Sequence, residues 1–118
     1  MKVYGVGRLT KDIDNIDFSA TGVCVVKFTL AENIYNYHTK ETEAEFYDCV
    51  AFGKLAERLG NLNIEKGEKL QIEGRLSVKV YVNKHGNKSK YTQIILNSFE
   101  LCGKKAGKKA GKRWKEYN

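Results

Sequence analysis

One segment, residues 68–82, restricts the possible folds more than any other part of the chain. Its sequence, EKLQIEGRLSVKVYV, alternates apolar with polar side chains, and a period of two indicates a β-strand with one buried face. The apolar series comprises Leu70, Ile72, Leu76, Val78, Val80 and Val82. Gly74 interrupts it, and a glycine inside a strand predicts a bulge or sharp bend of the kind that barrels need at a corner.

Four further segments have strand patterns, and one has a helical pattern. The expected strands cover residues 2–9, 22–33, 44–52 and 90–101. Between the third and the fourth strand of the chain, GKLAERLGNL places Leu55, Leu59 and Leu62 on one helical face, which predicts a short amphipathic helix. The remaining loops are residues 10–21, 34–43 and 83–89, with Gly86 at the tip of a hairpin.

Three strands, a helix and two strands follow one another along the chain, and this is the order of the OB fold. The predicted fold is therefore all-β, a five-stranded OB-fold barrel with a short helix between strands 3 and 4. A chain of 118 residues favours one domain, expected over residues 1–102. The expected core includes Phe18, Phe28 and Phe99, and at least two of the reduced cysteines Cys24, Cys49 and Cys102.

The positive charge of the chain is concentrated at its C-terminal end. Residues 103–118 hold seven basic residues and one acidic residue, which leaves 14 basic and 13 acidic residues in 1–102. Any nucleic-acid hypothesis for the barrel must therefore rest on where its charges lie. The lysine-rich tail is too polar to form a core, so it is expected to be disordered, and either to contact nucleic acid or to serve solubility.

Motifs of the common enzyme classes are missing from the sequence. There is no phosphate-binding loop, and the glycines of residues 5–7 lack the third glycine of a dinucleotide site. Asp12, Asp14 and Asp17 lack the glycine and the final glutamate of a calcium loop, and the histidines and cysteines have no zinc spacing. We expect no catalysis, no cofactor and no metal. No signal peptide or apolar span is visible, so we expect a cytoplasmic protein without membrane association.

Aromatic and basic side chains share strand faces that the core does not need. In the strand from residue 68, Arg75, Lys79 and Tyr81 lie together on the polar face. In the third strand, small residues at alternate positions suit a barrel interior, which turns Phe46 and Phe52 outward. Exposed rings of this kind suit base stacking, and the alternative is that the helix or a loop covers them. Tyr35 and Tyr37 begin a loop from which a ring can reach a ligand, and either can do so.

The sequence resembles the bacterial-type single-stranded DNA-binding proteins. The resemblance rests on VGRLTKD, FTLAEN, EFYDCVAFGKLAE, KGEKLQIEGRL and the hairpin from HGN to KYTQIIL, which occur in order within residues 2–101. It implies an OB fold, usually assembled as a homotetramer, that binds and protects single-stranded DNA during replication, recombination and repair. It also implies binding without sequence preference, through stacking and phosphate contacts.

The resemblance assigns roles to individual residues. Phe46, Phe52 and Tyr81 match the base-stacking aromatics of the family, and Tyr35 or Tyr37 stands near a fourth. Several of these places often hold tryptophan in relatives. Asp48 departs from the pattern, because some relatives are basic there. Lys54, Arg75 and Lys79 match positions where relatives present cations to phosphates. With Arg8 and Lys84 they make up the expected phosphate contacts.

The C-terminus departs most from the family pattern. Relatives generally end in an acidic tip that recruits replication proteins, whereas this chain ends in RWKEYN after its lysine repeats. Recruitment through such a tip is therefore not expected, and a phage or mobile-element version of the family is one explanation of the basic tail. The competing hypothesis is an OB-fold adaptor of a replication-initiation, primosome-like assembly that acts mainly through protein contacts.

Overall fold

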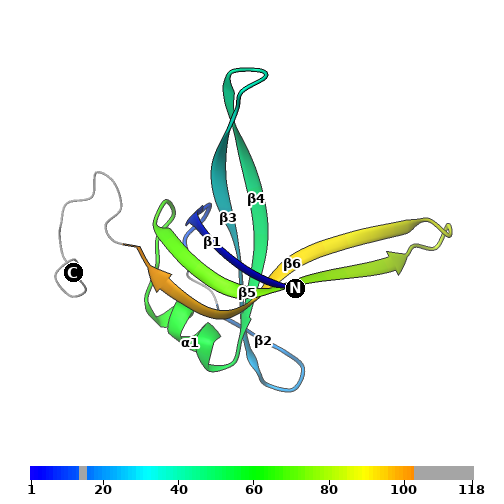
Figure 1. Cartoon of the computed structure of the whole chain (residues 1–118). Coiled ribbons are helices and arrows are strands. Elements are labelled where there is room, and N and C mark those ends of the chain that lie inside the picture. Colours follow the sequence, from blue (N-terminus) through cyan, green and yellow to red (C-terminus); the bar gives the residue numbers. More distant parts are fainter. Residues whose placement is uncertain (14–15, 103–118) are drawn as a thin grey trace.

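The computed structural model describes residues 1–13 and 16–102, which form a β-sheet structure with one helix (Figure 1). The strands are β1 (Lys2–Leu9), β2 (Asp17–Phe18), β3 (Cys24–Asn36), β4 (Glu41–Phe52), β5 (Lys69–Val82) and β6 (Lys88–Leu101), and the helix is α1 (Lys54–Asn61). The expected all-β class, the helix and the five main strands are confirmed.

The sheet closes into a ring. Its strands follow the order β1-β5-β6-β4-β3-β2, and β1 also pairs with β3 through Arg8 opposite Ala31 and Leu9 opposite Leu30. All neighbouring strands are antiparallel except β4 and β6, which run parallel where Cys49 and Val50 face Ile94 and Ile95. This closure at the end of β1 gives the OB architecture that the element order predicts.

The expected loop at residues 10–21 contains the extra strand β2, so the expected number of five strands is one too low. The helix therefore lies between β4 and β5 rather than between the third and fourth strands of the whole count. β2 pairs only with the first two residues of β3, where Phe18 faces Cys24. The core prediction for Phe18 is wrong, because this two-residue strand lies at the edge of the sheet, where the ring is 69% exposed.

β3 and β4 extend beyond the barrel as a hairpin, which we call the β3–β4 arm (residues 31–47). The prediction of a loop over residues 34–43 is wrong, because backbone pairing continues as far as Asn36 opposite Glu41. The side-chain oxygen of Asn36 accepts hydrogen bonds from the backbone N–H groups of His38 and Thr39, and Lys40 adopts a positive φ of 61°. Polar residues on both faces hide the strand alternation here.

β5 and β6 form a second hairpin, the β5–β6 arm (residues 78–92), which points away from the first (Figure 1). Gly86 lies at its tip with a φ of 84°, as expected. The predicted buried face of β5 is wrong beyond Leu76, because Val78, Val80 and Val82 are 52–58% exposed. At this point the strands leave the barrel, so the alternation continues with no core beneath it.

The predicted irregularity at Gly74 is present. The β5–β6 register shifts between Glu73, which faces Ser98, and Gly74, which faces Leu96. A side chain at position 74 would collide with the backbone carbonyl of Ile95, so only glycine allows β6 to approach this closely. The bulge supplies the bend with which β5 passes from the barrel wall into the arm.

The core lies inside the ring, and α1 covers one end. Ala56 and Leu59 of the helix are buried, whereas Leu62 follows the last helical residue and is exposed, contrary to the expected apolar face. The core positions of Phe28 and Phe99 are confirmed. The three cysteines are free, with Cys24 and Cys49 buried and Cys102 partly buried, as expected.

Candidate nucleic-acid interface

The register of β3 to β6 places most of the predicted binding residues on one side of the sheet. Cys49 and Ile94 face each other and point into the core, so the alternate residues of β4 and β6 point outward. We call this outward side, continued across β3 and the distal part of β5, the stacking face. Its aromatic members are Tyr35, Phe46, Phe52, Tyr81 and Tyr91.

Two phenylalanines are exposed on the β4 part of the stacking face. Phe46 is 64% exposed and faces Ala31, a small residue that leaves its ring uncovered. Phe52 is 46% exposed at the end of β4 and faces Val25. Neither the helix nor a described loop covers these rings, which excludes, for the described residues, the alternative that the sequence left open.

The two candidate tyrosines near the tip of the β3–β4 arm differ in position. Tyr35 lies in β3 opposite Thr42, on the same side of the arm as Phe46. Tyr37 lies in the turn, and its ring meets that of Tyr35 edge to face with the centroids 4.8 Å apart. Tyr35 therefore belongs to the stacking face, and Tyr37 supports its ring.

The β5–β6 arm brings a ring and two cations to the same side. Arg75, Lys79 and Tyr81 alternate along β5, and the ring of Tyr81 is 53% exposed. Tyr91 faces Lys79 from β6, so this hairpin presents a second ring. Our sequence prediction omitted Tyr91, although pairing the strands about the hairpin tip at Gly86 would have placed it opposite Lys79.

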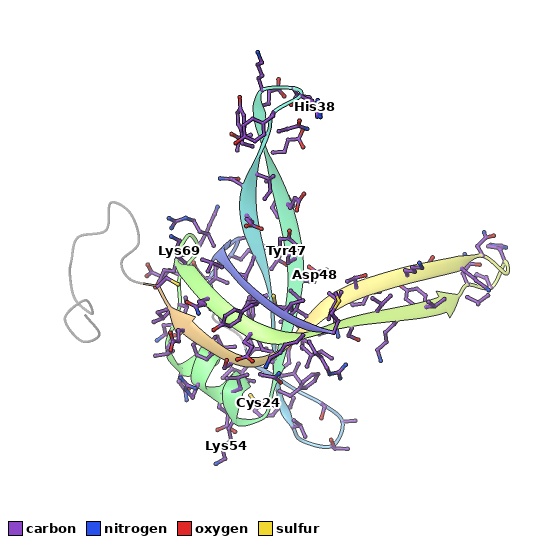
Figure 2. The ribbon with its side chains drawn as sticks, viewed as in Figure 1. Cys24, His38, Tyr47, Asp48, Lys54 and Lys69 are labelled. Atoms are coloured by element: carbon purple, nitrogen blue, oxygen red, sulfur yellow. The ribbon has the colours of Figure 1, made fainter. Side chains whose placement is uncertain are left out.

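The remaining predicted cations do not share one location. Arg8 lies on β1, outside the four strands of the stacking face, and its guanidinium donates to the carbonyl of Gly67 at 2.9 Å. Lys54 begins α1, two residues after Phe52, and Figure 2 shows it at the helical end of the molecule. Lys84 is in the turn at the tip of the β5–β6 arm. Lys27 was not predicted, although it lies on the stacking face opposite Val50.

A cavity of about 410 Å³ is lined by residues 10–13, which follow β1, and by residues of β3, β4 and β6. Its lining includes Lys27, Tyr91 and Gln93 together with Asp48. The hydroxyl of Thr29 donates to the Asp48 carboxylate at 3.0 Å, so this acid is held at the surface of the stacking face. Figure 2 shows Asp48 and its neighbour Tyr47, which the strand alternation sends to opposite sides of β4. The local negative charge opposes phosphate binding at this point.

One buried thiol and the metal-ligating side chains of the described residues do not have what a reactive thiol or a metal site needs. Burial raises the pKa of the Cys49 thiol to about 12, so this cysteine stays protonated. Within residues 1–13 and 16–102, no three metal-ligating side chains gather together. In the same part of the chain, no helix is long and apolar enough to cross a membrane.

Comparison with known proteins identifies the relatives of this chain. Residues 1–102 match the Single-strand binding protein family. Single-stranded DNA-binding protein 1 of Streptococcus pyogenes is 34% identical over 101 residues, which are 85% of this chain and 76% of that protein. The single-stranded DNA-binding protein of Clostridium perfringens is 35% identical over 100 residues, which are 85% of this chain and 64% of that protein.

The corresponding protein of Enterococcus faecalis is 37% identical over 97 residues, covering 81% of this chain and 50% of that protein. The chain thus spans between half and about three quarters of the length of these three relatives. The family match covers every element of the barrel, from β1 to the end of β6. The chain therefore belongs to the single-strand binding protein family.

Proposed function

We propose that this protein binds and protects single-stranded DNA without sequence preference, by stacking bases on exposed rings and pairing phosphates with lysine and arginine. The observation that carries the proposal is the presence of five partly exposed aromatic rings on one face of a continuous sheet. Every base has a face that can stack, so such a surface tolerates any sequence. Family membership and the names of the relatives support the same function.

The proposed roles follow from the positions of the side chains. Phe46, Phe52 and Tyr81 stack bases, with Tyr35 and Tyr91 extending the path along the two arms. Arg75, Lys79 and Lys27 release counterions from the phosphates between the rings. Lys54 and Lys84 add phosphate contacts beyond the two ends of the row of rings. Arg8 is the weakest candidate for a phosphate contact, because its guanidinium already donates a hydrogen bond to the carbonyl of Gly67. The mechanism requires no catalysis, cofactor or metal.

We further propose assembly into a homotetramer that begins at β1. The strand pairs with β5 along Lys2–Arg8 but meets β3 only at its last two residues, so one edge of β1 lacks a partner within the described chain. Tyr4 and Val6 are exposed there, beside a largely apolar groove of about 340 Å³. Unpaired edges favour pairing with a second copy. Light scattering that gives a mass near the 13.4 kDa of one chain at micromolar concentration would contradict this.

The process that we propose is the cytoplasmic handling of single strands during replication, recombination and repair. No observation favours the adaptor alternative, in which the barrel binds mainly proteins. A titration of labelled oligo-dT, followed by anisotropy, separates the two functions. We expect saturable binding, competition by unlabelled single strands of other sequences within a few-fold, and little competition by duplex. Equal competition by duplex, or no binding, would reject the proposed function.

A further inference from the structure

The β5–β6 arm has a second face that the proposed DNA contacts leave unused. Val78, Val80 and Val82 alternate along β5 on the side opposite Tyr81, and they are 52%, 57% and 58% exposed. Lys90 faces Val80 and Lys88 faces Val82 across the hairpin. We call this surface the valine–lysine face. An exposed apolar stripe of this kind, flanked by charge, is typical of a protein contact.

No described part of the chain covers this face. Figure 1 shows the β5–β6 arm projecting alone from the barrel, away from the β3–β4 arm. The core ends before the arm begins, since the last buried apolar residues of β5 and β6 on the barrel side are Ile72 and Ile94. Packing among the described residues of one chain therefore does not explain the valines.

The β3–β4 arm has a complementary surface on the side opposite its stacking face. Glu41, Glu43 and Glu45 alternate along β4, and Glu45 lies directly opposite Glu32 of β3. Like charges directly opposite each other destabilise a hairpin. Within the part of the chain that the structure describes, the salt bridge found joins Lys2 to Glu73, so no described lysine or arginine forms an ion pair with these glutamates.

An apolar residue completes the match between the two surfaces. Ile34 is exposed beside Glu43, its partner across the arm. We call these residues, Glu32, Ile34, Glu41, Glu43 and Glu45, the glutamate face. Residues on one face of a strand recur about every 6.7 Å, so the i, i+2 spacing of the glutamates on β4 equals that of Lys88 and Lys90 on β6.

We propose that the valine–lysine face of one copy docks on the glutamate face of a second copy of this chain. Lys88 and Lys90 pair with glutamates of β4, while Val80 and Val82 cover Ile34. Charge complementarity selects the partner, and burial of the valines supplies the attraction. Both stacking faces stay open in such a contact, so neighbouring copies can be joined while each one holds DNA.

Reversal of the charges tests the contact without DNA, by sedimentation velocity at low ionic strength. One double variant is Glu43→Lys/Glu45→Lys, and the other is Lys88→Glu/Lys90→Glu. We expect each to raise the dissociation constant of self-association about tenfold, because two attractive charge pairs become repulsive. An equimolar mixture of the two double variants should associate again, since each supplies a matching face for the other. Lys84→Glu, at the tip of the arm and outside the face, is the matched control and should leave association unchanged.

Several results would overturn the proposal. One is association that neither double variant alters, and another is a mixture that fails to regain it. If deletion of residues 103–118 abolishes self-association, the lysine-rich segment binds the glutamate face in place of the valine–lysine face. The glutamate variant should bind short oligo-dT at least as well as the parent, so loss of self-association with retained DNA binding distinguishes this contact from the proposed function.

Discussion

Phe52, Tyr81 and Tyr91 have partly exposed rings, and each ring lies on the stacking face. We expect alanine at any one of these positions to weaken oligo-dT binding by about 1 to 3 kcal/mol, because one stacked base loses its platform. Anisotropy titrations at constant salt measure the change. Thr92→Ala, beside Tyr91 but on the opposite side of β6, should leave the affinity unchanged.

Folding of these variants must be tested separately. Each ring variant should unfold in urea near the parent, since its side chain covers little of the core. Leu70→Ala removes a fully buried side chain and should cost about 2 to 5 kcal/mol of unfolding free energy. A ring variant that unfolds like Leu70→Ala, or that binds DNA like the parent, would show that its ring does not stack bases.

Tyr47 is expected to titrate above the ordinary range of a tyrosine. Its hydroxyl donates to the Glu45 carboxylate at 2.7 Å, and this bond together with burial raises its pKa to about 12. The fold favours the neutral phenol, so the stabilisation is complete below the ordinary tyrosine pKa of about 10 and disappears as the pH rises through about 12.

Ultraviolet absorbance of phenolate, recorded against pH, measures this shift. A late component should be present in the parent, absent in Tyr47→Phe and moved to lower pH in Glu45→Gln, which removes the carboxylate charge. If Glu45→Gln leaves the titration curve unchanged, the hydrogen bond to Glu45 is not the cause of the shift.

At the scale of the elements, Gly74 joins the barrel part of β5 to its arm. We expect Gly74→Ala to lower the unfolding free energy by about 1 to 3 kcal/mol, because the added methyl group collides with the carbonyl of Ile95 and must displace β6. Urea denaturation measures the effect. Gly5→Ala is the matched control, since open space surrounds that position and its φ is not positive. If the two variants have the same unfolding free energy, β6 moves aside for the methyl group without loss of stability.

The two arms show how pairing decides the length of an element. Polar residues occur on both faces near the tip of the β3–β4 arm, with Asn36, Glu41 and Glu43 on one side and Thr42 on the other, so strand character there comes from the hydrogen-bonded register and from the turn at Asn36. The valines of β5 show the opposite case, in which strong alternation continues where no core exists. Alternation of apolar and polar residues therefore indicates a strand, whereas the burial of its apolar face depends on which other elements pack against it.

At the scale of the whole molecule, the position of the charge gives a test of the C-terminal segment. Residues 103–118, which lie outside the described residues, carry +6 of the +7 formal charge. If this segment contacts DNA, its deletion should flatten the dependence of log affinity on log salt, by about 0.7 for each lost phosphate contact on a single strand. Affinity should fall most at low salt.

Titrations of the full chain and of the chain ending at Cys102, at several salt concentrations, measure both slopes. Parallel lines would mean that the lysines do not touch the strand and that the segment serves solubility or binds an acidic protein. The expected disorder of this segment stays a prediction, as does the domain boundary at residue 102.

The sequence by itself determined the elements and most of the candidate site. Period-two alternation identified the strands at residues 22–33 and 68–82, and a run that is apolar on both faces identified the last strand. Gly74 identified the bend, and the small residues at alternate positions of β4 turned Phe46 and Phe52 outward. These features are local, because the direction of a side chain relative to its neighbours follows from strand geometry alone. The OB order and the family resemblance followed from the same residues.

Only the tertiary structure decided which faces are covered. Phe18 is exposed because β2 lies at an edge, Val78 to Val82 are exposed because the barrel ends beneath them, and Tyr91 joins the stacking face because β6 pairs with β5 in one register. Each of these outcomes depends on a segment distant in the sequence. Hydrophobic burial depends on contacts between segments that are distant in the sequence. The alternation along a strand indicates only that its two faces differ, and the rest of the fold determines which face is exposed to water.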